Sequence, residues 1–505
     1  MKIKLLDIEV GNTPIVVLHK KDADDLGVHI SDRIKIQDGK CTHTAIVDIT
    51  DTFLIPGDIG LFKTLSKTIC AETGTKVKVI PTRKPPSIRF IRKKMDGQIL
   101  TENEIQRIVQ DIVNNDLSQV ELSAFITSVY VRGLNTPEIV SLTKNIVTHG
   151  QTLDLDVRPI IDKHCIGGIA GNRTTLIVVP IIAAAGLYIP KTSSRAITSP
   201  AGTIDSMEVL APINFNIEEM RDIVMKAHGC IVWGGGVNLA SADDKLIKIR
   251  YPLKIDPEPL LLASILAKKK AVGANKVLID IPVGHGSKIK ETKYAKELAA
   301  NFIKIGNKID IDVECAITPG DRPIGKGIGP QLEARDAIQI LHGKGPSDLR
   351  MKSLSLAGIL LEMGGIAEKG KGFRIAENIL NNGKALEAMQ YIIELQGGDP
   401  RHLDIEPQSL NFSVNSPHKG RIYDIDNNAV IKIARAAGAP VDKYAGLDFH
   451  VSRGALVKKG EPLFSINAEK EYKLDAAIEA VKKWKPIIYE KMILDRYSGS
   501  EILLE

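Results

Sequence analysis

The sequence predicts a multidomain α/β protein. Its domains would be a small N-terminal β-barrel, a helical domain, a central α/β domain with a mixed sheet, and a C-terminal α+β domain that is barrel-like. The first observation is length: the chain has 505 residues, and about 150 residues is a typical share for one domain. Second, short β-branched segments occupy both ends of the chain. Third, helical periodicity in between gives way to strands that alternate with helices, the pattern of a doubly wound sheet.

The changes of pattern divide the chain into four predicted domains. They are the N-terminal barrel at 1–84, the helical domain at 85–155 and 237–270, the α/β domain that binds phosphate and nucleotide at 156–236 and 271–405, and the C-terminal α+β domain at 406–505. In the first domain, β-branched segments are separated by Gly, Asp and Asn, and no reactive cluster is visible. We therefore expect a structural or assembly role for it.

Local signals predict the helices and strands that follow. Apolar residues three and four apart over 105–112 form one helical face. Ser118 and Glu121 are spaced as a capping box, and Pro137 suits the first turn of a third helix. The further predicted elements are a helix over 176–185, a buried strand over 276–282, a helix over 292–303 and a strand over 309–317.

Composition narrows the class of protein. No apolar run approaches the roughly 18 residues that span a bilayer, and the first ten residues carry no signal-peptide core. The five cysteines form no CxxC pair, so we expect no metal site and a reducing, cytoplasmic setting. The 67 basic and 61 acidic residues give a net charge of +6. This mild excess is not gathered in a patch with aromatics, which argues against nucleic acid, and composition leaves open a cationic pocket for an anionic substrate.

Two segments rich in Gly and hydroxyl residues carry the candidate chemistry. The first, 162–175, holds three glycines between Lys163 and Arg173, just before an apolar helix. Glycines let the backbone approach an anion, and amides at a helix start donate to it. The second, 191–205, holds six hydroxyl residues and Arg195. Each segment suits a phosphate group, while an ordinary tight turn and a run of Ser/Thr turns remain the alternatives.

Both segments resemble a known family. The stretches SSRAITSPAGTIDSMEVL and KHCIGGIAGNRTT resemble the signature and the phosphate loop of the thymidine and pyrimidine nucleoside phosphorylases. The resemblance covers roughly residues 86–500. The additional N-terminal barrel is similar to that of an archaeal branch whose substrate is AMP. The resemblance thus implies a glycosyltransferase (pentosyltransferase) that cleaves AMP, and also CMP and UMP, with phosphate to give free base and ribose 1,5-bisphosphate.

The resemblance also implies roles for individual residues. Asp256 would be catalytic, as the proton donor to the leaving base. The implied phosphate-binding residues are Lys163, Thr175, Ser193 and Thr203. The implied substrate-binding residues are Gly168, Ser194, Arg195, Ala196, Ile197, Thr198, Ser199, Thr203, Ser264 and Lys288. His164, Arg250 and Lys268 lie near positions where the family contacts the base.

Two departures from the family pattern bear on the substrate. Cys165 stands where the family has a serine, which would remove one phosphate donor, and Asn172-Arg173 replaces an acidic-apolar pair, which fits a nucleotide. A nucleotide brings about two negative charges that a nucleoside lacks. Lys163, Arg173, Arg195 and Lys288 are therefore four cations expected at a site that holds two phosphates.

The mechanism requires an acid near the purine, because a poor leaving base must be protonated. The residues before Asp256 include apolar side chains that would raise its pKa, while a helix cap at Pro257 is the competing structural role. The run 268–270 of three lysines is expected to be mainly a solvated helix face. His228 and Cys230 suggest a metal site only weakly, because no further ligands cluster with them.

Other functions remain open at the level of sequence. The first alternative is a thymidine or pyrimidine nucleoside phosphorylase. An enzyme like anthranilate phosphoribosyltransferase would need an acidic magnesium–pyrophosphate motif, which is not found at the phosphate loop. A non-catalytic assembly protein would leave two phosphate segments idle. We expect no cofactor besides phosphate as co-substrate, no nucleic-acid or membrane partner, and a homodimer or larger homo-oligomer.

Overall fold

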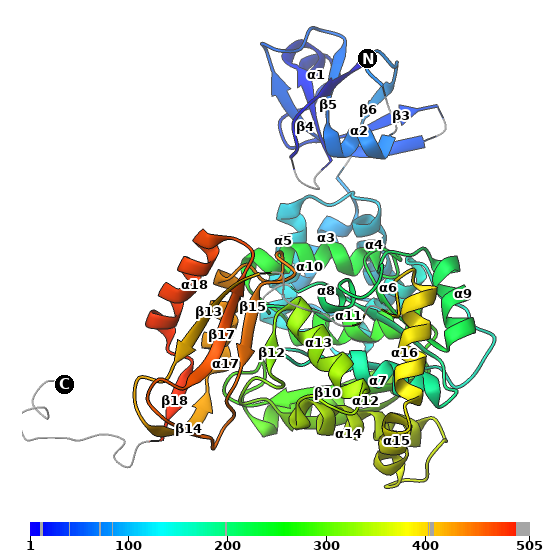
Figure 1. The fold of residues 1–505 in the computed structure, drawn as a ribbon. Coiled ribbons are helices and arrows are strands. Elements are labelled where there is room, and N and C mark those ends of the chain that lie inside the picture. Colours follow the sequence, from blue (N-terminus) through cyan, green and yellow to red (C-terminus); the bar gives the residue numbers. More distant parts are fainter. Residues whose placement is uncertain are drawn as a thin grey trace, which may run out of the picture. The chain divides into compact units, whose positions relative to one another are not determined.

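The computed structural model describes residues 1–10, 14–39, 41–69, 72–82, 84–196, 199–401, 403 and 409–490. The chain folds into two compact units, and each unit is built from two separate stretches of sequence (Figure 1). The first unit comprises Met1–Gln151 and Ala240–Ala267, and the second comprises Thr152–Leu239 and Lys268–Glu505. The finer division into four domains stays a prediction.

The N-terminal part of the first unit is a six-stranded sheet with two short helices. Its elements are β1 (Lys2–Leu6), β2 (Ile15–His19), α1 (Lys20–Leu26), β3 (Arg33–Asp38), β4 (Cys41–Thr50), β5 (Asp58–Phe62), α2 (Lys63–Ile69) and β6 (Lys78–Pro81). The strand order is β1-β5-β2-β4-β3-β6. In the described residues, an isolated antiparallel bridge joins Lys2 of β1 to Lys76, which lies two residues before the other end strand, β6. The sheet is therefore observed, and its closure into a barrel is not confirmed.

Helices form the rest of the first unit. They are α3 (Ser87–Met95), α4 (Glu102–Val113), α5 (Gln119–Arg132), α6 (Thr136–Thr148), α10 (Ser241–Leu253) and the greater part of α11 (Glu258–Ala271). Capping boxes at Thr101, Ser118 and Asn135 start α4, α5 and α6, because each cap supplies partners to amides that the helix leaves unpaired. The predicted helix starts near 118 and 136 are thus confirmed. The apolar face over 105–112 is buried, as expected.

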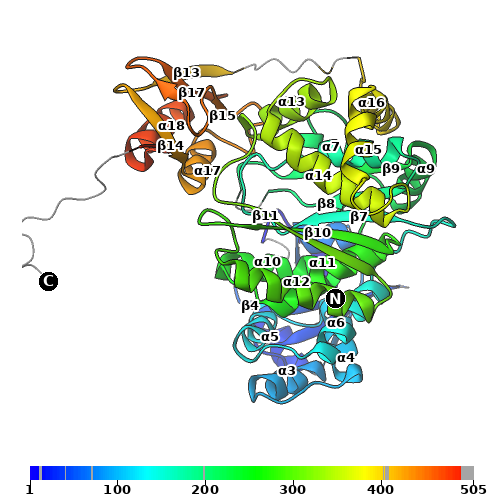
Figure 2. The ribbon, with the colours of Figure 1, turned by 90° about the horizontal axis from the view of Figure 1, so that it is seen from below.

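The second unit opens with an α/β arrangement. Its elements are β7 (Ile161–Cys165), α7 (Thr175–Ala184), β8 (Ile189–Ser193), α8 (Thr203–Met207), α9 (Ile217–Ala227), β9 (Gly229–Trp233), β10 (Lys276–Val283), α12 (Thr292–Asn307), β11 (Asp312–Pro319), α13 (Pro330–Leu341), α14 (Ser347–Met363), α15 (Gly372–Asn381) and α16 (Lys384–Leu395). Figure 2 shows β10 between α14 and α12, which both pack against it.

The strands of this region pair in parallel. One sheet has the order β11-β10-β7, and β8 pairs with β9. The prediction of a mixed sheet was wrong for these ladders. Helical crossovers between successive strands return the chain to the same edge, which produces parallel neighbours. The loops that follow β7, β8 and β10 therefore begin at the carboxyl ends of parallel strands. Open α/β sheets bind their ligands at this edge.

The C-terminal part of the second unit combines two small sheets with two helices. Its elements are β12 (Gly327–Ile328), β13 (Leu410–Asn415), β14 (Gly420–Ile425), α17 (Asn427–Ala436), β15 (Gly446–Phe449), β16 (Leu456–Val457), β17 (Pro462–Ala468), α18 (Glu471–Trp484) and β18 (Ile487–Tyr489). The sheet orders are β12-β15-β17-β13 and β16-β14-β18. Within the described residues these sheets do not form a closed barrel, so the α+β class is confirmed and the barrel-like shape is not.

Among the described residues, two hydrophobic cores lie in the second unit. The larger surrounds α7, whose residues from Thr175 to Ala183 are all buried. The C-terminal core contains residues of α17, β15 and β17, and it also includes Ala170, which belongs to the loop after β7. Of the helices in the described residues, none is both long and apolar enough to cross a bilayer.

Candidate active site

Strand β7 places Lys163 in the interior, at the start of the glycine-rich loop that covers 166–174. Its side chain is 1% exposed, and its Nζ donates a hydrogen bond to Thr174 Oγ1. Burial lowers the pKa of Lys163 to about 8, against the attraction of Asp280, which favours the charged form. A buried ammonium beside a glycine-rich loop is suited to bind an anion, because a bound anion would stabilise its charge.

Asp280 is the carboxylate that balances this charge. It lies on β10, is fully buried, and accepts a hydrogen bond of 2.6 Å from Thr318 Oγ1. Lys352 Nζ is 3.1 Å from its Oδ2 atom. Although burial opposes it, the charges of Lys352 and Lys163 lower the pKa of Asp280. The carboxylate is therefore shared between two lysines.

Cys165 closes β7 and contributes a thiol where the family has a hydroxyl. Its Sγ atom accepts hydrogen bonds from the amide of Gly167 at 3.4 Å and from Nδ2 of Asn172 at 3.2 Å. Burial raises the pKa of the Cys165 thiol to about 11, with a further contribution from Asp280. The thiol is therefore neutral near pH 7 and organises the loop through weak hydrogen bonds.

The glycine-rich loop touches the turn that carries Lys288. Gly168 has a φ of +101°, and a Cβ atom there would lie 2.7 Å from the backbone nitrogen of Lys288. Only glycine fits this approach without displacing the turn. Gly168 and Lys288, which the resemblance implies as substrate contacts, are thus neighbours in the structure.

The second candidate loop follows β8 and is held by Asp205. Oδ2 of Asp205 accepts hydrogen bonds from the amides of Ala196 at 2.7 Å and Gly202 at 2.8 Å. Ser193 ends the strand, and Ser194 is exposed. The remaining contacts come from Ser199, whose Oγ donates to Ala201 O at 2.9 Å, and from Thr203, which begins α8. The predicted residues Ile197 and Thr198 lie outside the described residues.

Two of the four expected cations, Arg173 and Arg195, form ion pairs with carboxylates in this structure. Arg173 is buried, forms an ion pair with Glu333, and donates to Thr203 Oγ1 at 3.3 Å. Arg195 donates to both carboxylate oxygens of Glu208, at 2.6 and 2.7 Å. Hydrogen bonding from Arg195 lowers the pKa of Glu208 to about 2, although burial opposes the shift. Arg173 therefore contacts the second loop, and the carboxylate of Glu333 neutralises much of the charge of Arg173.

A cluster of buried lysines lies beneath the site. We call Lys163, Lys191 and Lys269 the buried lysine cluster. Lys269 Nζ is 2.6 Å from Asp162 Oδ2, and both side chains are at most 2% exposed. Burial lowers the pKa of Lys191 to about 7, and repulsion from Lys269 adds to the shift. The expectation that 268–270 is a solvated helix face was wrong for Lys269, because its partner lies on the buried strand β7.

His164 lies beside this cluster. Burial lowers the pKa of its imidazole well below the ordinary value, with repulsion from Lys269 and Lys191 adding to the effect. The ring is therefore neutral near pH 7, so it can donate one hydrogen bond and accept another.

Arg250, Asp256 and Ser264, which the resemblance implies as catalytic or base-binding residues, form a cluster with Asp243 in the first unit. We call Asp243, Arg250, Asp256 and Ser264 the arginine cluster. Arg250 Nη1 donates to Asp256 Oδ1 at 3.0 Å, and Nη2 lies 3.5 Å from Asp243 Oδ1. Ser264 Oγ donates to Asp243 Oδ2 at 2.6 Å.

This geometry corrects the expected environment of Asp256. Apolar neighbours were expected to surround its carboxyl group. Instead the side chain is 45% exposed and forms an ion pair with the guanidinium of Arg250. An acid role for Asp256 then requires this ion pair to open when substrate binds, a rearrangement that catalytic groups often undergo.

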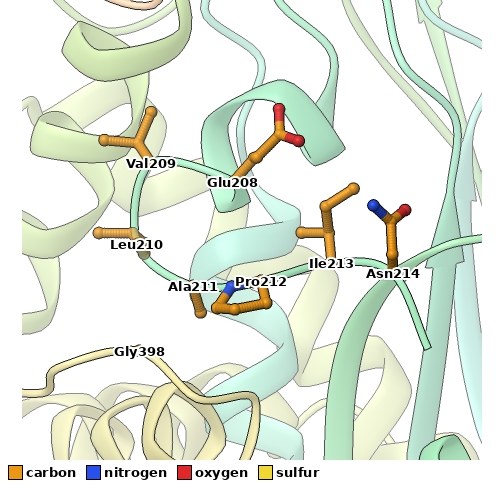
Figure 3. A pocket seen from close by; sticks show the side chains of 8 residues that line it. All are labelled: Glu208, Val209, Leu210, Ala211, Pro212, Ile213, Asn214 and Gly398. Atoms are coloured by element: carbon orange, nitrogen blue, oxygen red, sulfur yellow. The ribbon is translucent and has the colours of Figure 1, made fainter.

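A shallow cavity of about 370 Å³ follows α8 in the second unit (Figure 3). It is lined by Glu208, Val209, Leu210, Ala211, Pro212, Ile213, Asn214 and Gly398. None of the predicted site residues lines it, and its wall is largely apolar. The cavity is therefore adjacent to the second loop, through Glu208, without being the candidate site.

Several residues of the site were not singled out from the sequence. Thr174, one position before the predicted Thr175, is the hydroxyl that contacts Lys163. Asp280 carries a signal that was available, namely a single acid within an apolar strand, which is costly unless it is paired. Asp162 carries no such signal, because its strand also holds Lys163 and His164. Lys191 gave no such signal.

Comparisons of sequence with known proteins cover nearly the whole chain. The chain matches family models described as the helical bundle domain of a glycosyl transferase family over residues 88–150, the a/b domain of that family over 157–386, and the pyrimidine nucleoside phosphorylase C-terminal domain over 421–487. It is 45% identical over 499 residues to an AMP phosphorylase of Methanococcoides burtonii, covering 98% of each chain. It is 46% identical over 501 residues to one of Thermococcus sibiricus, covering 98% of this chain and 99% of the relative.

A solved structure shows the same fold at greater distance. Anthranilate phosphoribosyltransferase from Thermus thermophilus superposes with a TM-score of 0.52 and 16% sequence identity. The match covers 61% of this chain and 98% of that enzyme. At this identity the likeness concerns the fold alone.

Proposed function

The chain belongs to the AMP phosphorylase family, and from this premise we propose that it cleaves AMP with inorganic phosphate to give adenine and ribose 1,5-bisphosphate. The observation that carries the proposal is similarity of about 45% over nearly the full length of archaeal AMP phosphorylases. The enzyme is thus a glycosyltransferase (pentosyltransferase). CMP and UMP are proposed as further substrates, because the phosphate and ribose contacts do not depend on the base.

The proposed reaction exchanges one bond at C1′ of the ribose. The bond from C1′ to the purine nitrogen breaks with its electron pair leaving on the base, and a phosphate oxygen forms the new bond to C1′. The sugar becomes positively charged along the way, so a phosphate held beneath C1′ both supplies the nucleophile and stabilises the charge. A proton delivered to the base completes the balance.

The phosphate is proposed to bind at Lys163, with hydroxyl groups of Thr175, Ser193 and Thr203 as further donors. The buried ammonium of Lys163 supports this role, because its charge is shared with Asp280 and an anion would stabilise it further. No cofactor is needed for this chemistry, since phosphate is the second substrate.

The nucleotide is proposed to bind along the loops after β7, β8 and β10. The proximity of Gly168 to Lys288 supports a pocket in which Lys288 pairs with the 5′-phosphate. Ser194, Arg195, Ala196, Ile197, Thr198 and Ser199 would contact the substrate from the second loop, and Ser264 would contact the base. Asp256 is proposed as the acid that protonates the base after its ion pair with Arg250 opens.

The remaining proposals concern the state of the protein in the cell. We infer a homodimer or larger homo-oligomer in the cytoplasm, without nucleic-acid or membrane partners. We also infer that the N-terminal sheet closes into a small barrel, an inference supported by the bridge between Lys2 and Lys76.

Product analysis tests the activity directly. The protein is incubated with phosphate and, separately, AMP, CMP, adenosine or thymidine, and the released base and sugar phosphates are separated. Phosphate-dependent release of adenine from AMP, with little release from adenosine, is the expected result. Release from thymidine but not AMP would indicate a nucleoside phosphorylase instead. Lys163→Met serves as the inactive control, because it removes the proposed phosphate ligand.

A further inference from the structure

A single asparagine of the C-terminal part reaches two loops of the candidate site. Asn427 is the first residue of α17 and is 1% exposed. The preceding Asp426 caps this helix by accepting from the amides of Asn428 at 2.8 Å and Ala429 at 3.1 Å. The position of Asn427 is therefore fixed by the helix start, which leaves its side chain little freedom.

The side-chain amide of Asn427 makes three hydrogen bonds. Its Nδ2 donates to Gly168 O and to Gly286 O, each at 2.8 Å. Its Oδ1 accepts from the amide of Ala170 at 3.0 Å. Both donor hydrogens are used, and the opposite amide orientation would set an oxygen against two carbonyls. The partners therefore define how the amide is oriented.

These contacts join the glycine-rich loop after β7 to the turn after β10. At Gly286, a Cβ atom would lie 2.7 Å from Cβ of Asn427, so the turn approaches α17 closely. Ala170 is fully buried within the C-terminal core. The loop is thus attached to the C-terminal part both by packing and by hydrogen bonds.

We propose that Asn427 is a positioning residue for the nucleotide, because it holds the Gly168 loop and the Lys288 turn at one fixed spacing. The inference rests on the proposed function, in which Gly168 and Lys288 contact the nucleotide. Lys163 does not depend on this amide, since the pairing of β7 with β10 holds it in place. Loss of the amide therefore weakens nucleotide binding more than phosphate binding.

Kinetics of Asn427→Ala test this separation. We expect the KM for AMP to rise about tenfold or more, because buried backbone groups lose their partners and the loops shift. The KM for phosphate should stay within about twofold, since a shift in these loops leaves β7 unchanged. The matched control is Asn428→Ala, which removes the same side chain at the next, exposed position of the same helix. Equal increases in both KM values would overturn the positioning role.

A second variant and a second readout keep the test independent of folding and of catalysis. Asn427→Asp retains the shape and the acceptor for Ala170 but places an oxygen against the carbonyls of Gly168 and Gly286. We expect its KM for AMP to rise at least as much as in Asn427→Ala. Hydrogen exchange of the free protein should accelerate at 166–171 and 284–288 in both variants and stay unchanged in Asn428→Ala.

The two failures are distinguishable. If the unmodified protein releases no base from AMP, the proposed function fails, and with it the nucleotide role of Asn427. If the unmodified protein is active while exchange at both loops and the KM for AMP are unchanged in Asn427→Ala, only the positioning inference fails.

Discussion

The buried lysine cluster and the arginine cluster differ in how fully carboxylates compensate their positive charges. Arg250 lies between two carboxylates, those of Asp243 and Asp256, so its charge is compensated. In the second unit, the three lysines share Asp162 and Asp280, and Asp280 is also paired with Lys352. Burial lowers the pKa of two of these lysines towards neutrality. The lysine cluster is suited to receive an anion, whereas the arginine cluster has to rearrange before Asp256 can serve as an acid.

Replacing the proposed acid gives the largest expected effect. Asp256→Asn removes the proton donor but keeps the shape of the side chain and a contact with Arg250. We expect kcat for AMP phosphorolysis to fall about 10²- to 10⁴-fold, the usual contribution of general acid catalysis, with little change in nucleotide affinity. Steady-state kinetics and equilibrium binding of AMP measure the two quantities.

The control for loss of a surface carboxylate is Asp25→Asn, because Asp25 is an exposed aspartate of the N-terminal part. A kcat of Asp256→Asn close to that of the unmodified enzyme would remove Asp256 from the acid role. Catalysis would then not require the ion pair between Arg250 and Asp256 to open.

The next largest effect is expected on the free energy of unfolding, when the buried ion pair between Lys269 and Asp162 is broken. Lys269→Met leaves the carboxylate of Asp162 uncompensated in the interior, and breaking a buried pair costs about 3–5 kcal/mol. The lower end is expected, because the change also relieves repulsion between Lys269 and Lys191. Urea denaturation measures the free energy of unfolding.

The control is an exposed pair of the same residue types. Lys482 Nζ lies 2.6 Å from Glu479 Oε1, and the two side chains are 68% and 69% exposed. Lys482→Met should change the free energy of unfolding by less than about 1 kcal/mol, as is typical for surface pairs. Equal losses in the two variants would show that burial does not distinguish the lysine cluster.

The pH dependence of phosphate binding gives the smallest expected effect. Lys163 has a lowered pKa of about 8, so its ammonium is present below that pH and is lost as the pH rises. The KM for phosphate should rise about tenfold for each pH unit above 8, because one proton is then lost before phosphate binds. Initial rates at saturating AMP between pH 7 and 9.5 measure this.

Lys163→Arg sharpens the same measurement. A guanidinium stays protonated throughout this range, so the rise in KM should disappear, whatever the overall affinity of the variant. A rise that persists in Lys163→Arg would assign the titration to another group, and Lys191 is then the next candidate.

Elements specified by nearby residues were predictable from the sequence. Ser118 and Glu121 are three positions apart, and the helix they cap begins where the spacing predicts. The two phosphate segments were visible for the same reason, since their glycines and hydroxyls are contiguous. Parallel pairing of β7 with β10 was not visible, because it joins residues more than 100 positions apart.

Contacts of this long-range kind account for the errors at the site. Lys269 was taken for a surface residue because its neighbours in sequence are lysines, whereas its partner Asp162 is 107 positions away. Arg173 was expected to face substrate, and its partner Glu333 is 160 positions away. Thr174 contacts Lys163, whereas the predicted phosphate contact of the adjacent Thr175 stays a prediction.

The attachment of the glycine-rich loop to α17 has a consequence for synthesis. Ala170 is translated 257 residues before Asn427, a delay of roughly 10–50 s at ordinary rates of elongation. Throughout that interval the nascent chain contains Lys163 and Gly168 but lacks the side chain that fastens the loop. Completion of the nucleotide site is thereby tied to nearly complete translation, so that truncated chains are expected to be poor enzymes even when their α/β part has folded.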